Sequence, residues 1–169
     1  MKTYTQKLDE AKTLADVFEL VKEGVRRVLK TGRAGLTLGL AELGGGAQSW
    51  IGAFYPVGST TIIMNRTPLR RIAETEPRLF TAYAFHVLLH EYIHALGYVE
   101  EKSTRYLVAL ISSELFGPEH PVARMAQDIR LFFPQLTYST SGAAALEEVE
   151  ALELEMVPDF DRSSITYIR

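Results

Sequence analysis

The segment from residue 77 to residue 96 constrains the fold more than any other part of this chain. It is long and mostly apolar, it begins at Pro77, and Gly97 follows it directly. Proline suits the first turn of a helix, and glycine enters the left-handed conformation that ends one at little cost. The segment is therefore predicted to be one long helix. Two histidines and a glutamate interrupt it in the run HEYIH (90–94), and burying them requires a partner.

The run HEYIH has the spacing of a metal site. His90 and His94 are four residues apart, so in a helix both imidazoles lie on one face, one turn apart. Two imidazoles so placed can converge on a zinc ion about 2.0–2.1 Å from each nitrogen. Glu91 lies beside the pair, where its carboxylate can take a proton from a metal-activated water without ligating the metal. The pattern predicts a Zn²⁺ site with Glu91 as general base.

Two adjacent glutamates are candidates for the third ligand. The helix predicted over 100–115 follows a short turn at Gly97, so it should pack antiparallel to the first helix with its start near His94. Spacing favours Glu100, which lies ten residues after His90. In the longer metal-binding pattern His-Glu-x-x-His-x-x-Gly-x-x-His, the third ligand is at that position and Gly97 matches the glycine. Helical phase favours Glu101, which heads an apolar stripe made of Thr104, Val108, Ile111 and Leu115. We prefer Glu101 and keep Glu100 as the alternative.

Other ionisable residues near the motif are less suitable as ligands. His86 precedes His90 by one turn but lies about 12 Å from His94 along the helix axis, so it is expected in the core or lining a cleft. Glu114 is expected roughly 20 Å away along the second helix, and His120 lies farther along the chain. The chain has no cysteine, which excludes disulfides and thiolate zinc sites.

The remaining pattern predicts an α+β fold with an N-terminal helix and three strands before the motif helix. Residues 34–43 and 48–55 alternate on either side of the glycine turn 44–46 and are predicted to form a hairpin. The sheet is expected to be three-stranded and mostly antiparallel. The predicted helices are 13–31, with Thr13 and Asp16 as a capping box, 67–74, 77–96, 100–115 and 120–133, and the third strand is 60–66.

Length and composition limit the possible classes of protein. The 169 residues suit one domain, assigned to residues 1–137, and 47% of them are hydrophobic. No apolar run is long enough to span a membrane, and the first residues lack the apolar core of a signal peptide. The net charge of −3 argues against a nucleic-acid partner. These features predict a cytoplasmic protein without a membrane partner.

The C-terminal residues 138–169 form a second region. A small, polar, linker-like stretch covers 138–145, and residues 146–169 carry seven acidic and two basic residues. Within this tail, residues 152–157 alternate as a strand would. One hypothesis is self-inhibition, in which this strand adds to the edge strand 60–66 and covers the cleft. The alternative is a solvated acidic tail.

The run HEYIH, with the glutamate helix that follows it, resembles the zincin metallopeptidases. The two-helix arrangement is similar to that of the gluzincins, and the order of elements over about residues 50–116 resembles the minigluzincins. The resemblance implies a zinc ion on His90, His94 and a glutamate, with Glu91 as general base in the hydrolysis of a peptide or protein substrate. It also implies that the last strand before the motif helix is an edge strand that pairs with extended substrate. The residues of that strand are Thr61, Ile62, Ile63, Met64 and Asn65.

The chain also departs from the gluzincin pattern, and two alternatives stay open. Gluzincins usually have the third ligand farther downstream, and the nearby tyrosines, Tyr92, Tyr98 and Tyr106, include no clear oxyanion donor. The run HEYIHALGY is similar to one in bacterial rRNA-processing metal-dependent endoribonucleases, which have three histidines and no glutamate after the first. Glu91 and the acidic balance count against that alternative. A non-catalytic, zinc-stabilised regulatory domain is the other.

Overall fold

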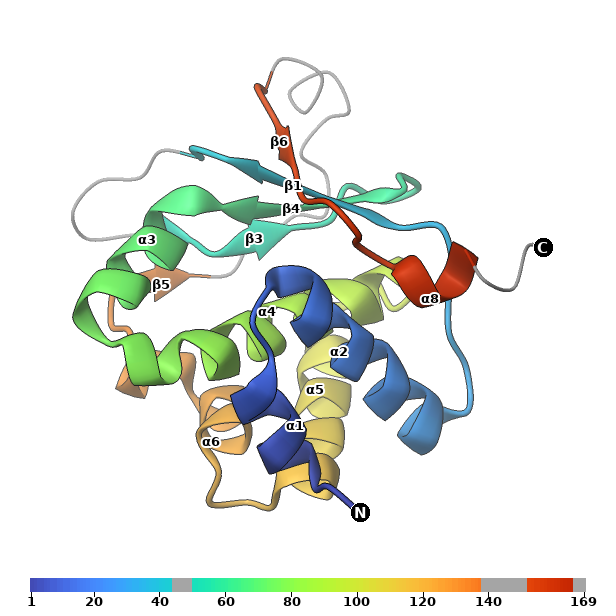
Figure 1. Cartoon of the computed structure of the whole chain (residues 1–169), viewed down its shortest axis with the longest axis vertical. Helices are drawn as coiled ribbons and strands as arrows, with labels where there is room; N and C mark the ends of the chain where they lie inside the picture. Colours follow the sequence, from blue (N-terminus) through green and yellow to red (C-terminus); the bar gives the residue numbers. More distant parts are fainter. Residues whose placement is uncertain (44–49, 138–151, 166–169) are drawn as a thin grey trace.

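The computed structural model describes residues 1–43, 50–137 and 152–165, and over these residues the protein is an α+β structure. Helices α1, α2, α4, α5 and α6 lie together on one side of a small sheet (Figure 1). None of the helices in the described ranges has the length and apolar character needed to cross a membrane.

The helical elements are α1 (Tyr4–Glu10), α2 (Leu14–Leu29), α3 (Arg66–Thr75), η1 (Pro77–Leu79), α4 (Phe80–Ala95), α5 (Glu101–Phe116), α6 (Pro121–Gln127), η2 (Ile129–Leu131) and α8 (Arg162–Ile165). The strands are β1 (Thr37–Ala41), β2 (Trp50–Ile51), β3 (Ala53–Phe54), β4 (Thr61–Asn65), β5 (Leu136–Thr137) and β6 (Glu155–Met156).

Helix α2 begins where the sequence predicts. The Thr13 side chain accepts a hydrogen bond from the Asp16 backbone N–H at 3.0 Å, and the Asp16 carboxylate accepts one from the Thr13 N–H at 3.2 Å. This capping box satisfies backbone donors that the first turn would otherwise leave without a partner. The helix ends at Leu29, two residues before the predicted end at residue 31, because Lys30 adopts a left-handed conformation. Helix α1, which was not predicted, also begins with a capping box.

Helix α4 is the centre of the protein. Its first turn is the 3-10 element η1, and the α-helix then runs to Ala95, so the predicted helix is present with a tighter start. Thirteen of its sixteen residues are buried, because α2, α3, α5 and α6 all pack against it and β3 contacts it too. A helix covered on all sides is apolar around its whole circumference. The histidines and glutamate of the motif are therefore held on a rigid, buried element.

The turn between α4 and α5 determines where Glu101 lies. Gly97 has a φ of 111°, a conformation that residues with a Cβ rarely adopt. The Gly97 N–H donates to the His94 carbonyl, and the Tyr98 N–H donates to the Ile93 carbonyl. Helix α5 then begins at Glu101 and packs against α4. The predicted two-helix arrangement is therefore present, and the short turn brings the start of α5 beside the end of α4.

The sheet differs from the prediction. Its strand order is β3-β4-β1-β6, with β1 parallel to β4 and both outer strands antiparallel to their neighbours. Strands β2 and β5 form a separate parallel pair. The predicted hairpin between 34–43 and 48–55 is wrong, because β1 pairs with β4 and β6 rather than with either strand of the second segment. The expected turn at 44–46 lies outside the described residues. Alternation identifies a strand but does not identify its partner.

Strand β4 lies inside the sheet. Its residues Ile63 and Met64 pair with β3 on one side, and the whole strand from Thr61 to Asn65 pairs with β1 on the other. The prediction that 60–66 is an edge strand is therefore wrong. The premise for expecting Thr61, Ile62, Ile63, Met64 and Asn65 to bind extended substrate is removed with it, because β-strand addition uses an edge strand and β4 has a partner on each side.

Candidate metal centre

The structure brings His90, His94 and Glu101 together. The Nε2 atom of His94 lies 2.8 Å from Oε1 of Glu101, and the Nε2 atom of His90 lies 3.2 Å from Oε2 of the same carboxylate. One ligand atom from each of the three residues lies within 4.8 Å of the others. The i, i+4 spacing on α4 supplies the two imidazoles, and the first turn of α5 supplies the carboxylate.

The two adjacent glutamates lie in different environments. Glu101 is half-buried, with its carboxylate between the two imidazoles. Glu100 is the N-terminal capping residue of α5, where its side chain makes no capping hydrogen bond and is exposed. The helical phase of α5 therefore places Glu101 beside the histidines, as the apolar stripe that includes Thr104 and Val108 predicts. Glu100, which the spacing argument favours, is not in this group.

The surroundings of His94 indicate which of its ring nitrogens is available. Its Nδ1 lies 2.7 Å from the backbone carbonyl oxygen of Tyr98 and 3.3 Å from the hydroxyl of Thr104. A carbonyl oxygen can only accept, so Nδ1 must carry the proton. Nε2, the nitrogen that faces Glu101, is then the one left to bind a metal ion. Such a contact from the non-ligating nitrogen to a carbonyl is typical of histidines that ligate metals.

The pKa values of His90 and Glu101 both shift towards the forms that bind a metal ion. Burial lowers the pKa of His90, and the nearby Glu101 carboxylate only partly opposes this shift. For Glu101, burial raises the pKa, but the contacts with His90 and His94 outweigh it and hold the pKa below its usual value. These directions favour a neutral His90 imidazole and an ionised Glu101 carboxylate, the forms that bind metal ions.

Glu91 is buried next to the group without belonging to it. Its side chain is 5% exposed, and burial, followed by the negative charge of Glu101, raises its pKa to about 8. Carboxylic acids with a pKa near neutrality are suited to take up and return a proton at physiological pH. The structure thus places the proposed general base in an environment that perturbs its titration, which is a common feature of catalytic sites.

The other candidate residues take different positions. His86 is buried outside the three-residue group and lines a pocket beside His90, one of the places expected for it. His120 caps α6 by accepting from the Val122 N–H, and Glu114 is exposed. Of the tyrosines, Tyr92 exchanges hydrogen bonds with the Arg33 backbone, whereas Tyr98 and Tyr106 have side chains that are 39% and 67% exposed.

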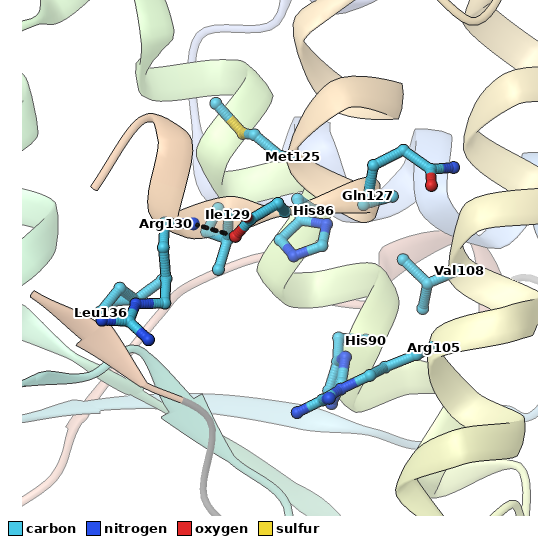
Figure 2. A pocket seen from close by; sticks show the side chains of 11 residues that line it. His86, His90, Arg105, Val108, Met125, Gln127, Ile129, Arg130 and Leu136 are labelled. Carbon is cyan, nitrogen blue, oxygen red and sulfur yellow. Dashed lines mark hydrogen bonds between the residues drawn. The ribbon is translucent and has the colours of Figure 1, made fainter. Parts of the chain in front are cut away.

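A pocket of about 380 Å³ lies beside His90. Figure 2 shows residues from α4, α5, α6 and η2, together with Leu136 of β5, around this space. Among its lining residues, Arg105 and Arg130 were not identified from the sequence. Arg105 follows Glu101 by one turn, so helical phase could have indicated it. No local pattern indicates Arg130, because η2 reaches the pocket only through the packing of α6 against α4 and α5.

The C-terminal segment docks away from the position expected for self-inhibition. Strand β6 pairs with β1, whereas the hypothesis placed it on 60–66, so that placement is wrong. Beyond β6, the Phe160 ring stacks on Phe18 with ring centroids 4.0 Å apart. The predicted linker 138–145 lies outside the described residues.

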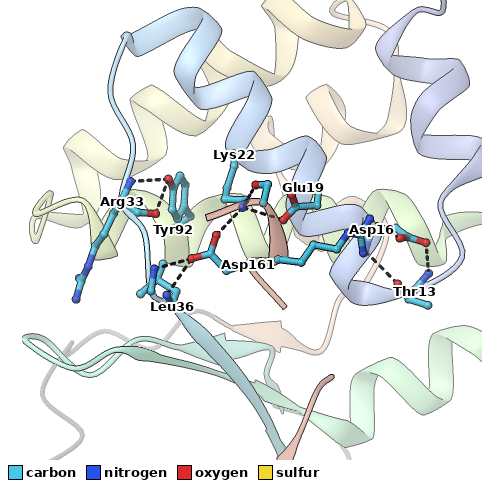
Figure 3. Close-up of polar contacts among 11 residues, drawn as sticks. Thr13, Asp16, Glu19, Lys22, Arg33, Leu36, Tyr92 and Asp161 are labelled. Carbon is cyan, nitrogen blue, oxygen red and sulfur yellow. Dashed lines mark hydrogen bonds and ion pairs between the residues drawn. The ribbon is translucent and has the colours of Figure 1, made fainter. Parts of the chain in front are cut away.

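Asp161 anchors this segment to the N-terminal half of the chain. Its carboxylate forms an ion pair with Lys22 of α2 and accepts hydrogen bonds from the N–H groups of Gly35 and Leu36 (Figure 3). The Asp161 side chain is 2% exposed, and the Lys22 side chain is 12% exposed. A charge so deeply buried depends on all of these partners. The segment is thus fixed to α2 and to the start of β1.

Removing the Asp161 carboxylate should destabilise the whole fold. We expect Asp161→Ala to lower the free energy of unfolding by about 2–4 kcal/mol, because it leaves two backbone donors without an acceptor and removes one of the two carboxylates paired with Lys22. Urea denaturation followed by circular dichroism measures the loss. Glu153→Ala is the matched control, since it removes an exposed acid from the same segment. Equal urea midpoints for the two variants would contradict the assigned role of Asp161.

Comparisons of the chain with models of protein families, with curated proteins and with solved structures find no match.

Proposed function

We propose that the protein is a zinc-dependent metallopeptidase in which His90, His94 and Glu101 hold the metal. One observation carries the proposal. The Nε2 lone pair of His94 faces the Glu101 carboxylate at 2.8 Å, while Nδ1 of the same ring must donate its proton to the Tyr98 carbonyl. Two electron-rich groups in such contact need a cation between them, either a proton or a metal ion. The second imidazole, from His90, favours the metal ion.

The donor set fits zinc in a catalytic role. Two imidazole nitrogens and one carboxylate are a usual combination for catalytic zinc, whereas structural zinc sites are normally closed by four protein ligands. In the part of the chain that the structure describes, the metal-binding group contains three residues. A coordination position would therefore be left for a water or a substrate oxygen, and this difference favours a catalytic over a purely structural metal site.

The residues around the metal site would divide the chemistry of hydrolysis among them. A zinc ion held there would supply Lewis-acid chemistry, acidifying a water molecule and polarising the substrate carbonyl. Glu91 would take the proton from that water and return it to the departing amine, a role for which a pKa near neutrality is suitable. Thr104 and the Tyr98 carbonyl would hold the ring of His94 in place.

A combined measurement of metal content and turnover tests the proposal. The purified protein should contain about one zinc ion per chain and should cut members of a mixed peptide library, as followed by mass spectrometry. Removing zinc with a chelator should abolish cleavage, and adding zinc back should restore it. Stoichiometric zinc without cleavage of any peptide would contradict the peptidase function and favour the zinc-stabilised regulatory domain. Zinc-dependent cleavage of RNA would instead favour the endoribonuclease alternative.

A further inference from the structure

The pocket beside His90 has an apolar wall. Four of its lining residues are apolar and buried, and they come from α5, α6, η2 and β5: Val108, Met125, Ile129 and Leu136. Its volume of about 380 Å³ lies in the range of pockets that enclose small ligand groups. Because His90 lines the same space, a group bound in this pocket would lie next to the proposed metal site. The wall is suited to an apolar side chain of a substrate.

Two arginines from different elements line the same pocket. Arg105 extends from α5 and Arg130 from η2, and in Figure 2 both guanidinium groups lie on the side of the pocket away from Met125. Both residues are exposed, in contrast to the buried apolar wall. The Nε atom of Arg105 is 3.9 Å from Oε2 of Glu101, which places this arginine at the border between the pocket and the metal site. The exposed part of the pocket therefore carries two permanent positive charges.

The acidic residue that lines the pocket, Asp128, is not paired with the Arg130 guanidinium. Asp128 also lines the space, but its carboxylate accepts a hydrogen bond from the Arg130 backbone N–H at 3.0 Å, as the cap of η2. Its orientation is thus set by the backbone of its own turn. Within the described residues, no carboxylate oxygen lies within 4.0 Å of the Arg130 guanidinium. Arg105 already has the Glu101 carboxylate 3.9 Å away, so the Arg130 guanidinium, with Arg105 beside the same space, is the group that favours an anionic ligand.

We propose that this pocket recognises a substrate carboxylate, held by Arg105 and Arg130, next to an apolar group that packs on the buried wall. The inference rests on the proposed peptidase function and names its substrate class. Guanidinium groups bind carboxylates through paired, charge-assisted hydrogen bonds. The carboxylate has two sources in a peptide, the free C-terminus and the side chain of glutamate or aspartate. An apolar residue that ends a chain combines both required features, so removal of C-terminal residues is the expected activity.

Two matched pairs of peptides distinguish these sources. The first pair shares one sequence ending in leucine, with a free carboxylate in one peptide and an amide in the other. The second pair ends in an amide and differs only in glutamate against glutamine at the last position. We expect kcat/KM to be about 10- to 100-fold higher for the free carboxylate of the first pair. A preference confined to the second pair would assign the carboxylate to a side chain, and equal rates within both pairs would overturn the proposal.

Arginine variants connect the preference to the pocket. We expect Arg130→Gln to reduce the carboxylate preference about tenfold, and the double variant with Arg105→Gln to abolish it. Arg124→Gln is the charge-matched control, because Arg124 is exposed on α6 and does not line the pocket. The zinc content of each variant is measured in parallel, since Arg105 also approaches Glu101. A preference that survives in the double variant with zinc retained would overturn the role of the arginines.

A binding measurement separates failure of the pocket from failure of the peptidase function. If the wild-type protein cuts neither these four peptides nor any member of the mixed library, the peptidase proposal fails, and the carboxylate site is then tested by calorimetry on zinc-loaded protein. The probes are N-acetyl-leucine and N-acetyl-leucine amide. Tighter binding of the acid, lost in the double variant, would support the carboxylate site without any turnover. Equal binding of both probes would overturn it.

Discussion

Replacing Glu91 by glutamine should lower kcat by about 10³- to 10⁴-fold while the protein keeps its zinc. Proton transfer by a positioned side chain contributes about 10²- to 10⁴-fold to a rate, and the glutamine amide cannot take a proton from water. Glu91 does not belong to the group formed by His90, His94 and Glu101, so zinc binding should persist. Steady-state cleavage of one peptide, together with zinc analysis of the same sample, measures both effects.

The Glu91→Gln variant should also fold normally, which makes the loss of activity interpretable. Burial raises the pKa of Glu91 to about 8, so in the metal-free protein this carboxyl is largely neutral at pH 7. Glutamine has the same shape and is also neutral, and burying it costs no desolvation of a charge. The thermal unfolding temperature without metal should therefore be equal to or above that of the wild type. A variant that keeps both its zinc and more than a tenth of the wild-type kcat would show that Glu91 is not the general base.

Exchanging the two neighbouring glutamates for glutamine should have opposite consequences for zinc. Glu101→Gln should weaken zinc binding by at least about 100-fold. Mutating a residue that only orients a metal ligand typically reduces metal affinity about 10- to 100-fold, and removing a direct ligand should reduce it more. Glu100→Gln should change the affinity by less than about threefold, since its side chain is exposed at the capping position of α5. Competition with a chromophoric chelator measures both constants.

The two variants form a matched pair, since each removes one carboxylate from adjacent residues and keeps nearly the same shape. The unfolding temperature of each variant without metal is measured as well, so that an effect on folding is separated from an effect on zinc ligation. The reverse result, with zinc lost in Glu100→Gln and kept in Glu101→Gln, would mean that the spacing of the longer zincin pattern decides the ligand. Equal affinities in both variants would remove the carboxylate from the site altogether.

Local signals predicted α2, α3, α4 and α5 and the arrangement of the candidate metal site, whereas the single helix predicted over 120–133 is divided into α6 and η2. The capping box at Thr13 and Asp16, and Gly97 after the motif helix, are chemical requirements of helix ends, and they depend on neighbours in sequence only. The preference for Glu101 came from the phase of α5, because an apolar stripe must face the neighbouring helix. The capping box of Thr3 and Gln6 was an equally local signal for α1, but the sequence interpretation overlooked it.

The sheet could not be predicted in the same way, because strand pairing depends on contacts between distant segments. The pairing of β1 with β4 joins Thr37 to Thr61, and nothing near either residue specifies the partner. One signal was present in β4 itself, where Ile62, Ile63 and Met64 are apolar without alternation. Such continuous apolar runs are typical of strands covered on both faces inside a sheet. The continuous apolar run of residues 62–64 therefore indicates that β4 is not an edge strand.

The attachment of the C-terminal segment to β1 has a consequence for the order in which the chain is completed during synthesis. Asp161 follows Leu36, whose N–H it binds, by 125 residues. At the usual translation rates of 5–20 residues per second, roughly 6 to 25 s separate the appearance of the two residues. Throughout that interval the outer side of β1 has no β6 to pair with, and such unpaired backbone invites association between nascent chains. The helices that carry the candidate metal site precede this last strand, so a chaperone that shields β1 would assist assembly of the sheet rather than of the proposed zinc ligands.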